Sequence, residues 1–191
     1  MKAFANTIGT DERISARYPR RLATGDGRSI TLTPLLPSDW ELLQRFVHDT
    51  PEEERRYFRR DLSEPQRVQR WCSELDYHRS LPILAWENDR ILADGVLLRD
   101  PGLWTAHLGT VRLLVHPDYR RLGLGSLMIG ELYALAEELD LHKLVYECAE
   151  EQAGLRAFLR KVGFREAARL PDFIRDAQGE FHSMIVMVRS L

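Results

Sequence analysis

Residues 111–126 read VRLLVHPDYRRLGLGS and contain the most informative pattern in the chain. The first part is apolar, which predicts the end of a strand running over about residues 106–115. A tight turn with Gly123 and Gly125 follows. Apolar side chains spaced four, three and four residues apart then predict a helix over residues 125–139. The order is therefore a strand, a glycine turn and a helix.

The start of that helix predicts a binding site for an anion. Backbone N–H groups in a first helical turn have no acceptor within the helix, and the helix dipole adds partial positive charge there. Glycine lets the main chain approach a ligand closely, and Arg120 and Arg121 add charge at the rim. The sequence matches neither a Walker loop nor the dinucleotide fingerprint. A turn in which the glycines serve tight geometry alone is the structural alternative.

The rest of the chain predicts a mixed α/β sheet that is antiparallel at first and has one parallel crossover. Residues 1–28 show no clear period and are expected to form an N-terminal arm, followed by a single domain over residues 29–191. The expected strands are residues 29–35, 81–86, 91–98, 106–115, 143–148, 164–170 and 181–188. Further helices are expected from Ser38, from Thr50, from Ser63 to about His78, and from Ala153 to Val162 before Gly163.

Composition excludes several classes of protein. A chain of 191 residues can form one hydrophobic core without disulfides or metals. The formal net charge is −2, which argues against a dedicated nucleic-acid binder. No apolar run is long enough to cross a membrane, and the first ten residues lack the pattern of a secretory signal. Cys72 and Cys148 fit no disulfide or zinc pattern. These observations predict a soluble, cytoplasmic protein that needs no metal.

Two blocks of sequence resemble the GNAT superfamily of N-acyltransferases. The pattern Arg-x-x-Gly-x-Gly over residues 120–125, preceded by VHPDY, is similar to the acyl-CoA-binding motif of that family. The second block, FLRKVGF over residues 158–164, is similar to the family's penultimate helix and its Gly-Phe ending. The resemblance covers roughly residues 30–188 and is specific between residues 111 and 164.

The resemblance implies a single-domain GNAT-like α/β fold whose two central parallel strands splay apart. The pantetheine arm of acetyl-CoA then enters the gap and pairs with the main chain of the first strand, while its diphosphate rests on the N–H groups of residues 121–126. Gln152 stands where the family often has an asparagine that helps to hold the pantetheine. The acyl-CoA-binding residues implied are Leu113, Leu114, Val115, Arg120, Arg121, Leu122, Gly123, Leu124, Gly125, Ser126 and Gln152.

The family transfers an acetyl group directly to an amine, so a base must remove the amine proton. Some branches use a glutamate on the first splayed strand, where this chain has Thr110. Other branches, including ribosomal-protein alanine acetyltransferases, use a glutamate on the second strand, and the matching residue is Glu147. It is the only carboxylate within Lys143–Cys148. The residue pattern equally allows Glu147 to lie at a solvated strand end or in an ion pair.

The departing thiolate can leave unassisted, use water or be met by a proton donor of the protein. Many members carry a tyrosine in the penultimate helix, where this chain has Leu159. Tyr146 is a second candidate, although strand alternation points it away from Glu147 and makes packing in the core or in a substrate wall the alternative. His107 can relay protons or be structural.

The implied function is transfer of the acetyl group of acetyl-CoA to a primary amine of a small molecule or a protein. The alternative is a non-catalytic acyl-CoA-binding or regulatory module, which Thr110 and Leu159 favour.

The charge run over residues 52–60 predicts an exposed helix face with paired charges. By analogy with the family, this region and the last hairpin form the acceptor wall, and Arg59 is one of its candidate contacts. A homodimer through the final strands is possible.

Overall fold

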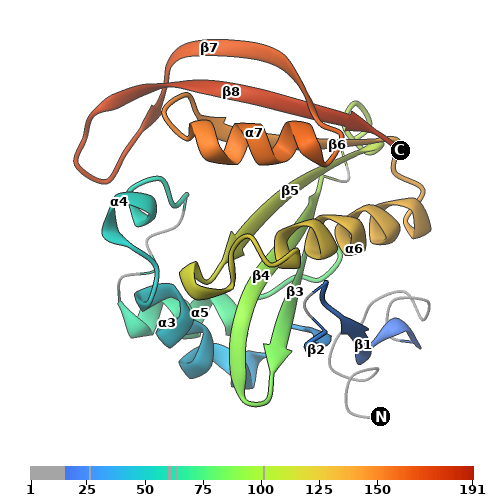
Figure 1. Ribbon diagram of the computed structural model, residues 1–191. Coiled ribbons are helices and arrows are strands. Elements are labelled where there is room, and N and C mark those ends of the chain that lie inside the picture. Colours follow the sequence, from blue (N-terminus) through green and yellow to red (C-terminus); the bar gives the residue numbers. More distant parts are fainter. Residues whose placement is uncertain (1–15, 26, 60–61, 63, 101) are drawn as a thin grey trace.

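A computed structural model describes residues 16–25, 27–59, 62, 64–100 and 102–191 of the chain (Figure 1). Residues 1–15, Asp26, Arg60, Asp61, Ser63 and Pro101, on which parts of the predicted arm, turns and helices fall, lie outside the described residues. In chain order the elements are β1 (Arg20–Ala23), β2 (Ser29–Pro34), η1 (Pro37–Asp39), α3 (Trp40–His48), α4 (Glu52–Arg55), α5 (Pro65–Ser73), β3 (Ser80–Glu87), β4 (Arg90–Arg99), β5 (Leu108–Val115), η2 (Pro117–Tyr119), α6 (Leu124–Glu138), β6 (Lys143–Ala149), α7 (Ala153–Lys161), β7 (Arg165–Arg175) and β8 (Phe181–Ser190).

The strands form one eight-stranded sheet in the order β1-β2-β3-β4-β5-β6-β8-β7. All neighbouring pairs are antiparallel except β5 and β6, which are parallel and joined through α6. The predicted mixed sheet with one parallel crossover is therefore confirmed.

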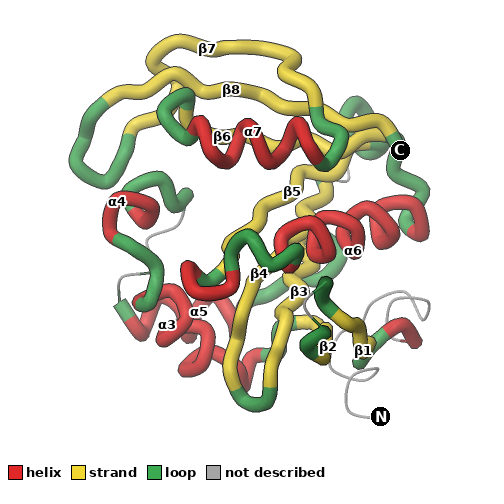
Figure 2. The backbone as a smooth tube through the Cα atoms, viewed as in Figure 1, coloured by secondary structure: helices red, strands yellow, loops and turns green. Residues whose placement is uncertain are grey.

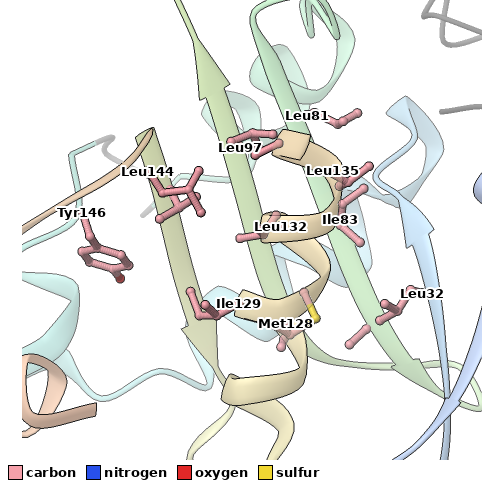
Figure 3. Close-up of a cluster of buried hydrophobic side chains, with 14 of the residues drawn as sticks. Leu32, Leu81, Ile83, Leu97, Met128, Ile129, Leu132, Leu135, Leu144 and Tyr146 are labelled. Atoms are coloured by element: carbon pink, nitrogen blue, oxygen red, sulfur yellow. The ribbon is translucent and has the colours of Figure 1, made fainter. Parts of the chain in front are cut away.

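Helices cover the sheet on both faces, and each face has its own apolar cluster. On one face α6 and α7 pack on the central strands, and Met128, Leu132 and Leu135 of α6 lie over Ile83 and its neighbours (Figure 3). On the other face α3 and α5 build a smaller cluster with strands β3 to β5. None of the helices in the described ranges is long and apolar enough to cross a membrane.

The two central parallel strands separate soon after they meet. Their pairing covers only residues 108–110 of β5 and 143–145 of β6, although β5 continues to Val115 and β6 to Ala149. Beyond this point β6 stays paired with β8, while β5 stays paired with β4. Figures 1 and 2 show β5 turning away from β6, β7 and β8, with α4 near the open side. We call this opening between residues 111–115 and 146–149 the wedge. It is the splay that the family resemblance implies.

Several elements differ from expectation. β1, within the predicted arm, was not predicted, and it pairs with β2 as an edge strand. α5 ends at Ser73 instead of about residue 78, because the Asp76 carboxylate accepts the His78 N–H and forms a local turn. β7 continues past residue 170 to Arg175 through a shift in register.

Candidate functional site

The loop before α6 leaves its backbone N–H groups available. Arg121 and Gly123 have positive φ, at 62° and 87°, and Gly123 is the N-cap residue, where a Cβ would be strained. The first bond into the helix runs from the Leu127 N–H to the Gly123 carbonyl, 3.0 Å. Within the described ranges, the N–H groups of residues 121–126 have no recorded acceptor, and no side chain caps the helix. These groups therefore present partial positive charge at the end of the wedge.

Gly125 allows this helix start to lie close to α7. A Cβ on Gly125 would stand 3.2 Å from Phe158 Cζ, which is tighter than an ordinary contact. Leu124 is buried in the core, whereas Leu122 is half-buried and Ser126 is exposed. In this predicted turn, the Leu124 side chain is therefore anchored in the core, while the backbone N–H groups stay accessible.

The edge of β5 that faces the wedge is reached by side chains. The Tyr146 hydroxyl accepts the Leu113 N–H and donates to the Leu113 carbonyl, both at 3.3 Å. The carbonyl of Val115 accepts from Arg120 Nε at 3.0 Å. Leu114 lies on the other face and packs against the α3 and α5 cluster. Both main-chain groups of Leu113 and the carbonyl of Val115, which were expected to pair with an acyl donor, thus have internal partners in this structure.

Tyr146 spans the wedge from β6 and is almost fully buried, with 6% of its surface exposed. Its ring packs edge-on against Phe164 at 6.5 Å between centroids. Burial is the main reason that its pKa is raised to about 12, so the hydroxyl keeps its proton at neutral pH. A protonated hydroxyl therefore lies at the centre of the wedge.

The two arginines before the glycine turn differ in their surroundings. Arg120 binds both carboxylate oxygens of Glu54 in α4, at 2.5 and 2.8 Å. Arg121 is exposed, and no partner of its side chain is recorded among the described residues. Only Arg121 thus matches the expectation of an available cation at the rim.

Glu147 lies on β6 beside the wedge, and its side chain is half-buried. Its carboxylate forms an ion pair with Arg59, which follows α4 in the chain. Arg59 also lies 3.8 Å from the Met184 sulfur of β8. The structure thus gives Glu147 the ion-pair environment that the residue pattern left open.

The hairpin of β7 and β8 adds a charged wall next to α4. Asp176 has a fully buried side chain that binds Arg56 Nε at 2.9 Å and His182 Nε2 at 2.8 Å. Burial alone would raise the pKa of Asp176, but these hydrogen bonds outweigh it and hold the pKa below its usual value. Glu180 completes a group of three possible metal ligands, yet Arg56 already pairs with it at 3.0 Å. Arg56 therefore already supplies a positive charge to both carboxylates of the cluster.

His182 gives this wall a dependence on pH. Its hydrogen bond to Asp176, and then its contact with Glu151 at 3.2 Å, raise its pKa above the usual value. Because the folded-state pKa is the higher one, the stabilisation is complete below about pH 6.5 and is lost as pH rises through the raised pKa. We expect chemical denaturation to show a fall in unfolding free energy over this range, and we expect His182→Gln to remove that fall. An unchanged pH profile in the variant would contradict the assignment.

Three further positions bear on the predicted site. Gln152 is the N-cap residue of α7, and its side-chain oxygen accepts the Ala149 N–H at 3.0 Å, next to the end of the wedge. Leu159 is fully buried in the core and offers no proton donor. Thr110 belongs to the last pair of residues before the strands separate.

The residue pattern did not indicate the partners that α4 and the residues after it supply. The charges over residues 52–60 were expected to pair along one exposed helix. In the structure α4 ends at Arg55, and the charges at positions 54, 56 and 59 pair with Arg120, Asp176 and Glu147. The only sequence signal was the charge run itself, because each partner is far away in the chain.

Comparison with known proteins gives a family match. A model of the acetyltransferase (GNAT) family matches residues 42–164. A curated relative, glucosamine 6-phosphate N-acetyltransferase from Schizosaccharomyces pombe, is 34% identical over 55 residues. That match covers 29% of this chain and 47% of the relative, so it spans about half of the relative's length.

Several solved structures have the same fold. The GNAT domain of S. lividans PAT superposes with a TM-score of 0.75 at 17% identity, covering 92% of this chain and 98% of that domain. Ribosomal-protein-alanine N-acetyltransferase from Brucella melitensis gives a TM-score of 0.72 at 18% identity, covering 84% and 99%. The family match spans both the wedge and the glycine turn, and the chain therefore belongs to the acetyltransferase (GNAT) family.

Proposed function

We propose that this protein transfers the acetyl group of acetyl-CoA directly to a primary amine. The observation that carries the proposal is the run of unpaired N–H groups at residues 121–126, at the end of a wedge between two parallel strands. A diphosphate needs several convergent donors, and a pantetheine arm needs a strand edge that no neighbouring strand pairs with. Both features lie on one continuous path along β5.

Donor binding requires that Tyr146 gives up its two bonds to Leu113. Leu113 then offers its main-chain groups to the pantetheine, and Val115 offers its carbonyl when Arg120 Nε leaves it. Gln152 lies near the end of the same path. Arg121 adds charge beside the diphosphate, and Arg120 can do so once it leaves Glu54. These residues hold the thioester in place, so the remaining chemistry is proton transfer and orientation.

Glu147 is proposed to accept the proton of the acceptor amine, directly or through water. It stands on the strand that borders the wedge, and it becomes available when Arg59 moves. Once released from Leu113, the Tyr146 hydroxyl is proposed to donate a hydrogen bond to the departing thiolate. In this assignment the two residues share β6 and act from its two faces.

Replacing Tyr146 by phenylalanine is expected to lower kcat about tenfold or more. A hydrogen bond to a charged group contributes about 1.5–3 kcal/mol, and about 1.4 kcal/mol corresponds to tenfold in rate. The ring and its packing on Phe164 remain, so the fold is retained. Steady-state kinetics of thiol release measures the change. A variant with unchanged kcat and a lower KM for acetyl-CoA would mean that the hydroxyl only competes with the donor.

The function itself is tested by thiol release from acetyl-CoA over a panel of acceptors. The panel contains glucosamine 6-phosphate, a small diamine, free amino acids, a lysine peptide and a peptide with N-terminal alanine. An increase in rate that depends on one class of amine supports the transferase. CoA binding without any acceptor-dependent turnover would favour a non-catalytic acyl-CoA-binding module instead. That second candidate is favoured by the ion pair that occupies Glu147 and by Leu159 at the position of the usual acid.

A further inference from the structure

Residues 52–59 contact three separate parts of the proposed site through ion pairs. Glu54 binds Arg120 in the loop before α6, Arg56 binds Asp176 in the β7–β8 hairpin, and Arg59 binds Glu147 in β6. We call residues 52–59 the strap. In Figure 1 the strap begins with α4, which lies beside the hairpin at the open side of the wedge. One short segment is therefore paired with Arg120, the proposed contact of the acyl donor, and with Glu147, the proposed contact of the acceptor amine.

The Glu54 carboxylate offers Arg120 a pair of negatively charged oxygen acceptors, as a phosphate would. Its two oxygens accept parallel hydrogen bonds from the two terminal nitrogens of the guanidinium, at 2.5 and 2.8 Å. Arginine recognises carboxylate and phosphate with the same planar fork. The Nε of Arg120 remains on the Val115 carbonyl, so the side chain already points along the wedge. A diphosphate at the start of α6 would compete with Glu54 for this arginine.

Arg59 offers the Glu147 carboxylate a positively charged N–H donor, as a protonated amine would. Its guanidinium donates to the Glu147 carboxylate and also lies against the Met184 sulfur. The carboxylate would accept an ammonium ion in the same way, since both are cationic donors. A cationic acceptor would therefore compete with Arg59 for Glu147.

The third ion pair differs from the other two in its burial. The side chains of Arg120 and Glu54 are 36% and 35% exposed, and those of Arg59 and Glu147 are 46% and 26% exposed. Asp176, in contrast, has no exposed side-chain surface, and the Arg56 carbonyl also accepts the Ala177 N–H at 3.2 Å. Half-exposed ion pairs contribute little to stability and exchange readily, whereas breaking a buried pair is costly. Arg56 thus anchors the strap while its two other contacts can open.

We propose that the strap is an internal occupant of the substrate site, in which Glu54 stands in for the donor diphosphate and Arg59 for a cationic acceptor amine. The inference rests on the proposed function, and it adds the substrate class: the acceptor carries its amine as an ammonium ion that replaces Arg59. The two stand-ins flank the Arg56 anchor, so displacing Glu54 leaves the strap held by fewer contacts and lowers the cost of displacing Arg59. The acceptor then meets a site that the donor has opened.

The test uses CoA alone as the probe, in titration calorimetry with the full chain. Glu54→Gln removes the competitor of Arg120 and is expected to tighten CoA binding about threefold, the scale of a half-exposed ion pair. Arg59→Gln removes the second contact of the strap and is expected to tighten it about twofold through linkage. Glu166→Gln and Arg160→Gln are the matched controls, because they break an exposed ion pair between α7 and β7 with the same changes in charge. Both controls should bind CoA as the wild type does.

Each outcome bears on a separate claim. Unchanged or weaker CoA binding by Glu54→Gln would mean that Glu54 only positions Arg120, and it would overturn the inference. Wild-type affinity in Arg59→Gln would overturn the coupling between the two stand-ins. Failure of the wild type to bind CoA would instead overturn the proposed function. Thermal melts without ligand check that each variant is folded, so that unfolding is excluded as the cause of any loss of CoA binding.

Discussion

Replacing Glu131 by alanine is expected to lower the free energy of unfolding by about 3–5 kcal/mol, the usual cost of removing one partner from a buried ion pair. Glu131 points from α6 toward the chain before β1 and is 3% exposed. Its oxygens accept from Arg17 Nε at 2.6 Å, from the Tyr18 hydroxyl at 2.8 Å and from Arg20 at 2.6 Å. Without the carboxylate, two guanidinium groups and a phenol lose their common partner.

The charge state of Glu131 follows from the balance of these contacts. Burial alone would raise its pKa, but the hydrogen bonds from Arg17 and Tyr18, with the charges of Arg17 and Arg20, hold the pKa below its usual value. Its contribution to stability is therefore present above the normal carboxyl pKa of about 4.3 and is lost as pH falls through the lower folded value. The loss in Glu131→Ala should accordingly be largest near neutral pH.

Urea denaturation of Glu131→Ala beside Glu138→Gln gives the measurement. Glu138 lies on the same helix and also pairs with Arg17, but its side chain is 35% exposed. The cost of Glu138→Gln should stay below about 1 kcal/mol, as for exposed ion pairs. Equal small losses in both variants would mean that β1 and its neighbours are held by backbone pairing with β2 and not by α6.

The elements that the sequence predicted well are those with a local cause. α6 and β5 follow from apolar spacing and a glycine turn that needs a left-handed N-cap at Gly123. The early hairpin, β6 and α7 follow from similar patterns, and so does the parallel crossover. β1 was missed because residues 20–23 alternate only weakly, and because it forms by pairing with β2 and by the distant Glu131.

The sequence allowed the backbone N–H groups of the candidate site to be predicted, but it did not allow its side-chain contacts to be predicted. Residues 121–126 lie in one turn, so their available N–H groups could be inferred from the sequence around them. The partners of Arg120 and Glu147 could not, because Glu54 and Arg59 lie 66 and 88 residues away in the chain. The position of the Tyr146 hydroxyl also depends on how far two strands separate, which no local pattern encodes. These long-range contacts decide which of the candidate side chains are already paired within the protein.

Replacing Glu147 by glutamine is expected to lower kcat by about 10²–10⁴-fold, the usual contribution of a positioned general base. Glutamine keeps the shape of the side chain and can still accept a hydrogen bond from Arg59, but it cannot take a proton from an ammonium ion. The fold should be unaffected, since the carboxylate is half-buried at the border of the wedge. Thiol release with the best acceptor of the panel measures kcat, and melting curves check the fold.

The same variant separates a base from a residue that only holds the strap. If Glu147 serves only as the partner of Arg59, Glu147→Gln should behave as Arg59→Gln does, with tighter CoA binding and an unchanged kcat. If Glu147 is the base, kcat falls in Glu147→Gln and not in Arg59→Gln, although both variants weaken the same ion pair. Raising the pH should restore part of the rate of Glu147→Gln, because a larger fraction of the acceptor amine then arrives without its extra proton. A loss that no increase in pH reverses would contradict proton removal as the role of this carboxylate.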